Sequence, residues 1–283
     1  MRSDAGGTVT GRFSYSNPNL QQIPARHAIL GPLIRSIFVP EKNCEWGIFD
    51  YSQQEPRLVV HYASLQEFTG ASKFLDAYEE EDTTDFHQLV ADIANIPRKQ
   101  AKTINLGLFY GMGKGKLMSQ LGLNQEDAED LLADYHDRVP FVRQLMKDTM
   151  YKAGKKGFLR TLRGRKCRFD MWEPKTFGVH KALPLKEAAN EYGDQMIKRA
   201  WTYKALNRLI QGSAADQTKQ AMLNLYKEGY LAHIQVHDEL DFSVESDKDA
   251  DRIKEIMETC VEDLIVPSKV DVERGPNWGE AGK

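Results

Sequence analysis

The strongest constraint on the fold comes from two β-prone runs near the C-terminus, in the segment YLAHIQVHDELDFSVES. The runs AHIQV and LDFSV meet at His237 and Asp238 without a Gly or Pro at the corner. This pattern predicts a tight antiparallel hairpin. Because Asp is a common turn residue, the acidic tip is either an ordinary polar turn or a place where Asp238 and Glu239 are held for chemistry.

The elements expected around this hairpin narrow the fold class. An amphipathic helix over 215–228 precedes the hairpin, a second one over 247–265 follows it, and KVDVE at 269–273 predicts a last strand. WGIFD at 46–50 reads as another buried strand. Helices and antiparallel strands in this order predict an α+β fold, with the helices on one face of a small sheet.

Composition excludes several classes of protein. The net charge of −3 argues against a simple DNA-coating protein, although an enzyme with a local basic groove remains compatible with it. No apolar run reaches the roughly 18 residues of a membrane span, and the N-terminus lacks the apolar core of a secretory signal. Three widely spaced cysteines contain no CxxC pair and suit a reducing compartment. We expect a cytoplasmic protein without a membrane partner.

Two acids occupy similar places in this predicted fold. Asp50 ends the strand 46–50, and Asp238 stands at the turn after AHIQV. If the two strands are neighbours, both carboxylates emerge at one edge of the sheet. Carboxylates from two strands suit Mg²⁺, with water and phosphate as further ligands, and two such ions can clamp a phosphoryl transfer. Surface acids are common, so this pair alone does not decide the matter.

Three further patterns concern local structure. SQQEPRLVVHYASL predicts a helix, and Ser52 and Glu55 have the spacing of a capping box at its start. Residues 182–228 predict two helices with a break near Gln211 and Gly212. The stretch 154–168, GKKGFLRTLRGRKCR, is basic and is either a backbone-binding patch for nucleic acid or a solvated face.

A second constellation lies in the predicted helix IPRKQAKTINLGLFYGMG. Residues at every fourth position of this helix form a slowly winding stripe along one side. The stripe consists of Arg98, Lys102, Leu106 and Tyr110. It offers cations for a triphosphate at one end and an aromatic platform for a base at the other. The alternative is a solvated basic face beside a core stripe.

These segments resemble conserved motifs of the family A DNA polymerases, the DNA polymerase I type. DYSQQEPR at 50–57 is similar to motif A, the R-x3-K-x7-YG pattern from Arg98 to Gly111 to motif B, and VHDE at 236–239 to motif C. TGRFSYSNPNLQQIP at 10–24 resembles the segment ahead of motif A, and QGSAAD at 211–216 the segment ahead of motif C. The five segments stand in the family's order and extend over nearly the whole chain.

The resemblance implies a right-hand polymerase with an antiparallel palm sheet and a mainly helical fingers subdomain. The palm is expected over 1–75 and 206–283, and the fingers over 76–205. The implied activity is template-directed DNA synthesis from deoxynucleoside triphosphates on primer–template DNA, with two Mg²⁺ ions. Leu106 and the compact chain are also reminiscent of phage members.

The resemblance assigns roles residue by residue. Asp50, Asp238 and the carbonyl of Tyr51 are expected to bind metal, with Glu239 in support. His87 and Arg98 are expected to hold the triphosphate, and Lys102 to act as general acid toward the leaving pyrophosphate. Glu55 is the expected steric gate against a 2′-hydroxyl, paired with Tyr110, which also marks the template-base position. The residues expected to contact primer–template are Arg12, Asn207, Gln211 and His237.

The sequence departs from the family in three places. Leu106 replaces an aromatic residue, which predicts stronger rejection of dideoxynucleotides, while Gln54 and Pro56 replace apolar residues of motif A. No thumb or 3′–5′ exonuclease segment precedes the first motif, so we expect a separate polypeptide to supply them. The alternatives are a catalytically idle remnant that binds primer–template or a partner, and a two-metal nuclease, in which the stripe from Arg98 to Tyr110 has no role.

Overall fold

The protein is described here by a computed structural model that covers residues 8–24, 27–110, 114–176, 178 and 180–281. The chain divides into two compact units. Unit 1 comprises Met1–His61, Ala77–Thr83 and Ser213–Lys283, and unit 2 comprises Tyr62–Asp76 and Thr84–Gly212. At three of the points where the chain passes from one unit to the other, the boundary lies inside a helix. These helices are α2 (Gln54–Ser64), α3 (Ala71–Glu80) and α10 (Ala205–Lys227).

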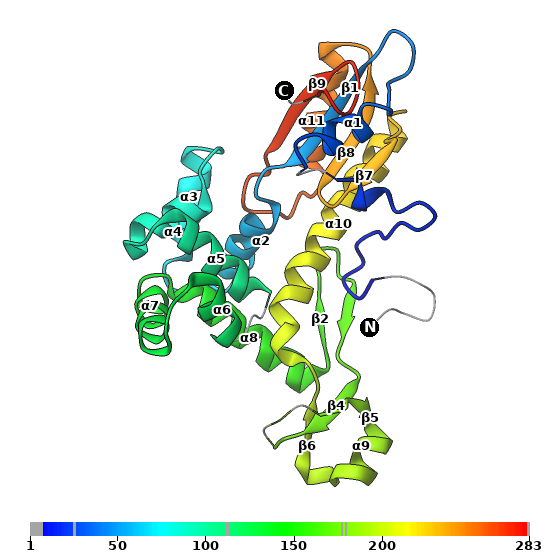
Figure 1. The fold of residues 1–283 in the computed structure, drawn as a ribbon. Helices are drawn as coiled ribbons and strands as arrows, with labels where there is room; N and C mark the ends of the chain where they lie inside the picture. Colours follow the sequence, from blue (N-terminus) through cyan, green and yellow to red (C-terminus); the bar gives the residue numbers. More distant parts are fainter. Residues whose placement is uncertain (1–7, 25–26, 111–113, 177, 179, 282–283) are drawn as a thin grey trace. The chain divides into compact units, whose positions relative to one another are not determined.

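Unit 1 is built on a four-stranded antiparallel sheet with the strand order β7-β8-β1-β9 (Figure 1). Its strands are β1 (Glu45–Tyr51), β7 (Ile234–Val236), β8 (Glu239–Val244) and β9 (Val270–Gly275). The predicted strand at 46–50, the hairpin and the last strand are therefore confirmed. The strands that carry Asp50 and Asp238 are direct neighbours.

The two faces of this sheet differ in character. Phe49, Leu240 and Phe242 point to one face, each at most 2% exposed, and pack beneath α11 (Asp247–Thr259). Tyr51 reinforces this face because its hydroxyl donates to the carbonyl oxygen of Met257 at 2.8 Å. Trp46 and its neighbours on the opposite face pack against Trp278. The carboxylates described below share that second face.

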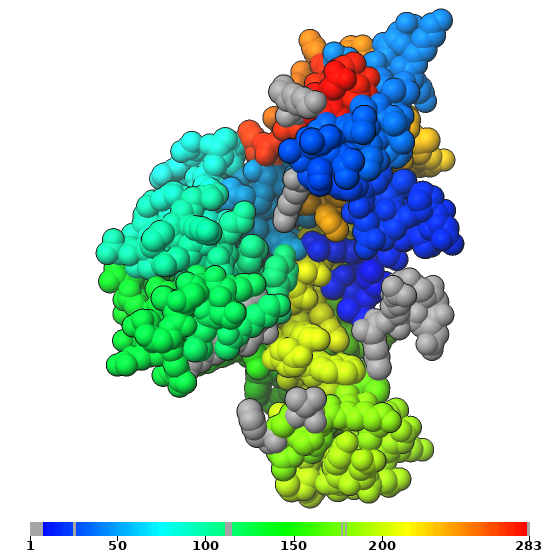
Figure 2. Space-filling view, in the orientation of Figure 1, coloured from blue at the N-terminus to red at the C-terminus, as the bar shows by residue number. Residues whose placement is uncertain are grey.

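The chain ends of unit 1 cover the Trp278 side of the sheet. They contain the short helices η1 (Leu20–Gln22) and α1 (Leu30–Arg35), and the turn that carries Trp278. The backbone N–H of Trp278 donates to Phe38 at 3.1 Å, and the blue and red segments lie side by side in Figure 2. Gly279 permits this approach, because a Cβ there would collide with the carbonyl oxygen of Pro32.

Unit 2 is mainly helical. Its helices are α4 (Phe86–Ala94), α5 (Arg98–Phe109), α6 (Lys114–Leu121), α7 (Gln125–Arg138), α8 (Pro140–Lys156) and α9 (Leu185–Tyr192). Its strands are β2 (Phe158–Arg160), β3 (Lys166–Arg168), β4 (Met171–Pro174), β5 (Leu183–Pro184) and β6 (Ile197–Arg199). Strands β2 and β3 form the hairpin of the basic stretch 154–168. Strands β5-β4-β6 and α9 form a small lobe of their own, yellow-green in Figure 2.

Local signals explain where the helices around the motif B segment begin and end. Asp85 caps α4, accepting from the backbone N–H of His87 at 2.8 Å. Asn95 ends α4 in a left-handed conformation, and α5 starts directly after Pro97. Residues 95–97 therefore separate the two helices. The glycines of YGMGKGK at 111 and 113 lie outside the described residues.

Two local predictions were wrong. Gln53 adopts φ +53°, so α2 begins at Gln54 and Ser52 cannot cap it; the N–H of Ser52 instead donates to the carbonyl oxygen of Lys269. The predicted break near Gln211 and Gly212 does not exist, because α10 runs through it. Gly inside a helix costs only about 1 kcal/mol relative to Ala, and burial can offset that. The interruption lies earlier, in 193–204, where η2 (Asp194–Met196), β6 and η3 (Thr202–Lys204) occur.

In the described ranges, no helix combines the length and the apolar character that a membrane crossing requires.

Candidate active site

The hairpin tip is a two-residue turn made of His237 and Asp238, between Val236 and Glu239, which lie directly opposite each other. His237 has φ +57°, a left-handed conformation that a two-residue turn needs but that normally favours Gly. The side-chain amide of Gln235 donates to the carbonyl oxygen of His237 at 2.6 Å, and the N–H of Tyr51 donates to that of Asp238 at 3.4 Å. The turn is therefore fixed against the end of β1.

Three carboxylates form a row across the sheet. Asp50 on β1 lies directly opposite Glu239 on β8 and Asp271 on β9. Neighbouring strands are only about 4.7–4.9 Å apart, and like charges placed opposite each other destabilise a sheet. The next row along the same face places Asp241 and Glu273 on either side of Ile48. The fold thus concentrates negative charge beside the hairpin tip.

The pKa values reflect this crowding. Burial, together with the charges of Asp238 and Glu239, raises the pKa of Asp50 to about 8. Burial and the charge of Glu239 raise the pKa of Asp241 to about 9. Burial also raises the pKa of Asp238, against the opposing effect of its backbone hydrogen bond and of Arg12. Among the described residues, one buried oxygen of Asp50 and both oxygens of Asp241 lack a hydrogen-bond partner.

Few positive groups offset these acids. Arg35 stacks over the Trp278 ring at 4.3 Å and lowers the pKa of Glu239 and Asp241 against the effect of burial. The indole N–H of Trp278 donates to Glu239 at 3.3 Å. Arg12 donates to Glu55 at 2.5 Å, which joins two predicted site residues in one ion pair.

The residues of this face fit a hard divalent cation. Buried carboxylate oxygens without partners, beside other carboxylates, are the donor set that Mg²⁺ accepts. In the part of the chain that the structure describes, no group of three or more His, Cys, Asp or Glu side chains converges as a complete metal cage would. A cation beside Asp50 and Asp238 would therefore take further ligands from water, a backbone carbonyl or a substrate phosphate.

The second group of predicted residues lies on helix α5 of unit 2. Its inner face is buried by Ala101, Ile104 and Leu108, among others. The side chains of the predicted stripe lie off that face, with Arg98, Lys102 and Tyr110 exposed and Leu106 half-buried. Arg98 forms an ion pair with Asp85 at 2.5 Å.

His87 lies beside the stripe in a buried position, with 7% of its surface exposed. Its Nδ1 is 3.0 Å from the side-chain nitrogen of Asn105, whose oxygen accepts from the Tyr135 hydroxyl at 2.5 Å. Burial, opposed by the charge of Asp85 and assisted by those of Lys102 and Arg98, lowers the pKa of His87 to about 4. His87 is therefore a neutral imidazole at pH 7, and it shares its surroundings with Arg98 and Lys102.

The structure thus sorts the predicted site residues into two groups. Those of unit 1 are Asp50, Tyr51, Glu55, Arg12, His237, Asp238 and Glu239. Those of unit 2 are His87, Arg98, Lys102, Leu106, Tyr110, Asn207 and Gln211. Asn207 and Gln211 are half-buried and one helical turn apart on α10. Within each group the charges of several members influence one another's pKa.

Sequence reasoning missed several residues that support these groups. They are Arg35, Asp85, Asn105, Asp241, Asp271, Glu273 and Trp278. Acids at every second position of ELD and of DVE were a visible signal, because alternate residues of a strand share one face. No comparable signal marked Arg35 or Trp278.

Residues 3–280 match the family described as DNA polymerase family A. The chain belongs to this family. It is 39% identical to a protein named DNA-directed DNA polymerase of Pseudomonas phage M6, over 97% of this chain and 44% of the phage protein. It is 33% identical to a DNA polymerase I of Rhizobium leguminosarum, over 97% of this chain and 27% of that protein. The chain thus spans less than half the length of these curated relatives.

A solved structure of a POL domain shares the fold. The structure titled "POL domain of Pol1 from M. smegmatis complex with DNA primer-template and dNTP" is 30% identical and matches with a TM-score of 0.75. The match covers 98% of this chain and 47% of the other. The mixed α+β fold, the family and its phage-like character are therefore as expected from the sequence.

The structure accommodates the two departures in motif A. Gln54 is buried, and its amide nitrogen lies 3.2 Å from the side-chain oxygen of Gln217 and 3.3 Å from that of Thr218. Its polar group is therefore satisfied. Pro56 is the third residue of α2, where a backbone N–H has no partner within the helix.

Proposed function

We propose that this chain is the catalytic core of a template-directed DNA polymerase that adds deoxynucleotides to a primer 3′ end. The observation that carries the proposal is the row of carboxylates at Asp50, with a buried, unpartnered oxygen at the edge where the hairpin tip and β1 meet. A fold that keeps such repulsion at the position of two family motifs supports a cation-dependent site.

Asp50, Asp238 and the carbonyl oxygen of Tyr51 would hold Mg²⁺. Two bound Mg²⁺ ions supply activation of the primer hydroxyl and neutralisation of charge on the leaving pyrophosphate. Glu239, held by the Trp278 indole N–H, supports the position of the carboxylates. The turn that bears Asp238 is fixed through Gln235 and Tyr51, so the chain sets the place of this carboxylate before substrate arrives.

The nucleotide would bind through the stripe on α5. Arg98, which forms an ion pair with Asp85, contacts the triphosphate. Lys102 gives a proton to the departing pyrophosphate oxygen. His87 contributes as a neutral hydrogen-bonding group, since its pKa of about 4 leaves it uncharged. Leu106 lies beside the incoming nucleotide.

Glu55 would act as the steric gate against a 2′-hydroxyl. Its ion pair with Arg12 fixes the carboxylate in place. Arg12 also contacts the primer–template minor groove together with Asn207, Gln211 and His237. Such contacts follow base-pair geometry with little sequence preference, because minor-groove acceptors are similar for all pairs.

Unit 1 corresponds in this proposal to the palm and unit 2 to the fingers. The basic hairpin of β2 and β3 carries Arg160, Lys166 and Arg168, with the exposed ends of Arg160 and Lys166 available for a phosphate backbone. A polypeptide that carries a thumb and a 3′–5′ exonuclease would add duplex grip and proofreading.

The test is primer extension by the purified chain with Mg²⁺ and four deoxynucleotides, beside an Asp238→Ala control. Extension by the parent alone supports the proposal. Degradation of primer–template without dependence on deoxynucleotides would instead indicate a nuclease. Folded protein that binds primer–template but extends nothing, with or without a family A thumb fragment, would indicate an idle remnant and overturn the proposal.

A further inference from the structure

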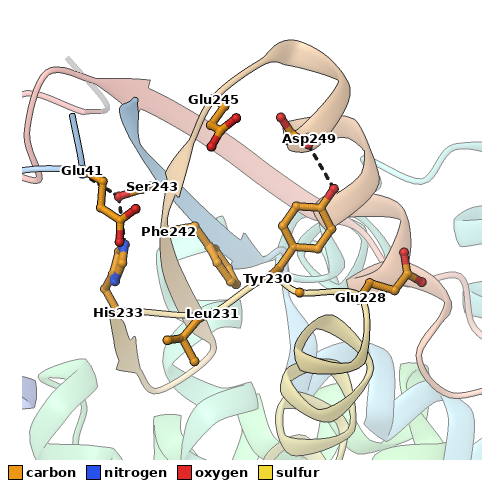
Figure 3. Close-up of a pocket in the computed structure, with 10 residues that line it drawn as sticks. Glu41, Glu228, Tyr230, Leu231, His233, Phe242, Ser243, Glu245 and Asp249 are labelled. Carbon is orange, nitrogen blue, oxygen red and sulfur yellow. Dashed lines mark hydrogen bonds between the residues drawn. The ribbon is translucent and has the colours of Figure 1, made fainter. Parts of the chain in front are cut away.

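A surface groove on unit 1 lies outside the site described above. It consists of two adjoining cavities of about 400 Å³ and 280 Å³ that share Tyr230, Leu231 and Phe242 in their linings. The walls come from the end of α10, the segment 228–233, and strand β8, with the start of α11 at the rim (Figure 3). We call this feature the Tyr230 groove.

The larger cavity of the Tyr230 groove is acidic. Four carboxylates line it, those of Glu41, Glu228, Glu245 and Asp249. Glu228 is paired with Arg252 at 2.6 Å, and Asp249 accepts from the Tyr230 hydroxyl at 3.1 Å. Among the described residues, the carboxylates of Glu41 and Glu245 form no ion pair.

A neighbouring thiol reports the same negative field. Burial, followed by the charges of Glu245, Glu41 and Asp249, raises the pKa of Cys44. The wall of this cavity is also ordered, because the Ser243 hydroxyl accepts from the N–H of Glu41 and lies 2.8 Å from Nε2 of His233. The backbone at Glu41 and the ring of His233 are therefore both fixed to Ser243 of β8.

The smaller cavity of the groove is apolar. Met222, Leu225 and Ala232 line it together with large side chains at its rim. These rim side chains remain exposed, with Leu223 at 49%, Tyr226 at 68% and Leu231 at 65%. A contiguous group of exposed large apolar side chains next to polar residues is typical of an interaction site.

We propose that the Tyr230 groove binds a short peptide segment of a partner protein that combines apolar side chains with Lys or Arg. The apolar side chains occupy the cavity beside Leu223 and Tyr226, and the cationic group enters the cavity between Glu41 and Glu245. Charge complementarity selects this occupant. DNA and anionic lipid carry charges that the carboxylates of Glu41 and Glu245 repel.

The experiment measures fluorescence anisotropy of labelled peptides with the full chain. The probe is a peptide of alternating Leu and Lys, compared with a Leu–Glu peptide and a Ser–Lys peptide. We expect saturable binding of the Leu–Lys peptide, at least about tenfold weaker binding of the other two, and weakening in high salt.

Two variants locate the binding. Leu223→Ser and Glu245→Lys should each weaken binding of the Leu–Lys peptide by about tenfold, which is a difference of about 1.4 kcal/mol. The matched controls are Leu185→Ser, at a side chain that is also 49% exposed, and Glu187→Lys, an exposed acid on α9. Both controls should leave binding unchanged within about twofold. Thermal melting checks that all four variants fold.

Three results would overturn the proposal. The first is equal binding of the Leu–Glu peptide, which removes the charge argument. The second is an effect of Leu223→Ser no larger than that of Leu185→Ser, which moves binding elsewhere. The third is self-association in sedimentation velocity that Leu223→Ser abolishes and the peptide does not compete with, because the groove would then join two copies of this chain.

Discussion

The sheet face of unit 1 and helix α5 of unit 2 carry charges of opposite sign in different settings. Asp50 is largely buried, lies between Glu239 and Asp271, and has a pKa raised to about 8. Arg98 is exposed and already paired with Asp85. The acids are thus held under mutual repulsion, whereas the bases have solvent and counterions available.

This difference shows which charged groups must be held in place by the backbone and which need no such support. Carboxylates brought together without a cation repel one another, so only a rigid sheet can keep them in register. Cations on an exposed helix hold their positions at little cost, because water and Asp85 screen them. We therefore expect charge removal to stabilise unit 1 and to change unit 2 very little.

The largest expected effect is that of Asp50→Asn. The isosteric amide cannot replace a carboxylate toward Mg²⁺, so primer extension should fall by about 10³-fold or more. The same change should raise the melting temperature in EDTA, by about 2–4 °C for each kcal/mol of repulsion relieved. Extension kinetics and melting curves measure the two effects. Asp130→Asn, at an exposed acid of α7, is the control and should change neither. A lower melting temperature for Asp50→Asn in EDTA would contradict the strained sheet face.

Substitution of Leu106 tests the nucleotide stripe. Leu106→Tyr adds a ring with a hydroxyl beside the proposed nucleotide site and should improve the use of dideoxynucleotides over deoxynucleotides by about tenfold or more. Chain-termination patterns on a primed template measure the ratio. The control is Thr103→Tyr, because Thr103 is half-buried on the same helix. Leu108→Tyr would not serve as a control, since Leu108 lies on the buried face of α5. An unchanged ratio for Leu106→Tyr would remove Leu106 from the nucleotide site.

The pH dependence of stability should also distinguish the two units. The carboxyls of Asp50 and Asp241, with pKa values of about 8 and 9, keep protons that an unfolded chain has already released above about pH 4. Metal-free unit 1 should therefore lose stability as the pH rises toward 8 and 9. The pKa values of His87 and His136 are lowered to about 4, mainly by burial, so unit 2 should lose stability as the pH falls from about 6.5 to 4. His61 adds the same acid loss to unit 1.

Both units should therefore lose stability in acid, and only the loss of stability toward alkaline pH distinguishes unit 1 from unit 2. Hydrogen exchange measured by mass spectrometry, corrected for intrinsic rates, resolves peptides of β1 and β8 from those of α4 and α7. In EDTA, protection of β1 and β8 should decrease above pH 7, Mg²⁺ should restore it, and Asp241→Asn should reduce the loss. Equal alkaline loss in α4 would show that the acids of unit 1 are not its cause.

The sequence predicted the strands and helices that carry the candidate site residues. It predicted less well which side chains surround each charged group. Asp50 and Asp238 could be found because the first ends a predicted apolar strand and the second stands at the turn after one. Asp271 could not be placed beside Asp50, since β9 pairs with β1 although the two strands are more than 200 residues apart in the sequence. The burial of His87 depends on Asn105 and Tyr135, which reach it only through helix packing. The capping box at Ser52 failed because spacing does not reveal the positive φ of Gln53.

The smallest expected effect concerns Asp85, and it tests whether unit 2 is free of electrostatic strain. Asp85 caps α4 and also forms an ion pair with Arg98. Burial raises the pKa of Asp85, but hydrogen bonds from Arg98 and from the backbone of Gln88 and His87 outweigh burial and lower it. Asp85→Ala removes the cap and should lower the free energy of unfolding by about 1 kcal/mol. Asp85→Asn keeps a good cap and loses only an exposed ion pair, so its cost should stay below about 0.5 kcal/mol.

Urea denaturation of the parent and both Asp85 variants measures these differences. Asp134→Ala is the matched control, because Asp134 forms an exposed ion pair with Arg138 at 2.9 Å and caps no helix. Its cost should resemble that of Asp85→Asn. If Asp85→Asn costs as much as Asp85→Ala, the charge itself stabilises unit 2. Arg98 would then be firmly held before any triphosphate arrives. The basic helix of unit 2 would in that case depend on its charges for stability, contrary to the contrast with the acidic sheet of unit 1.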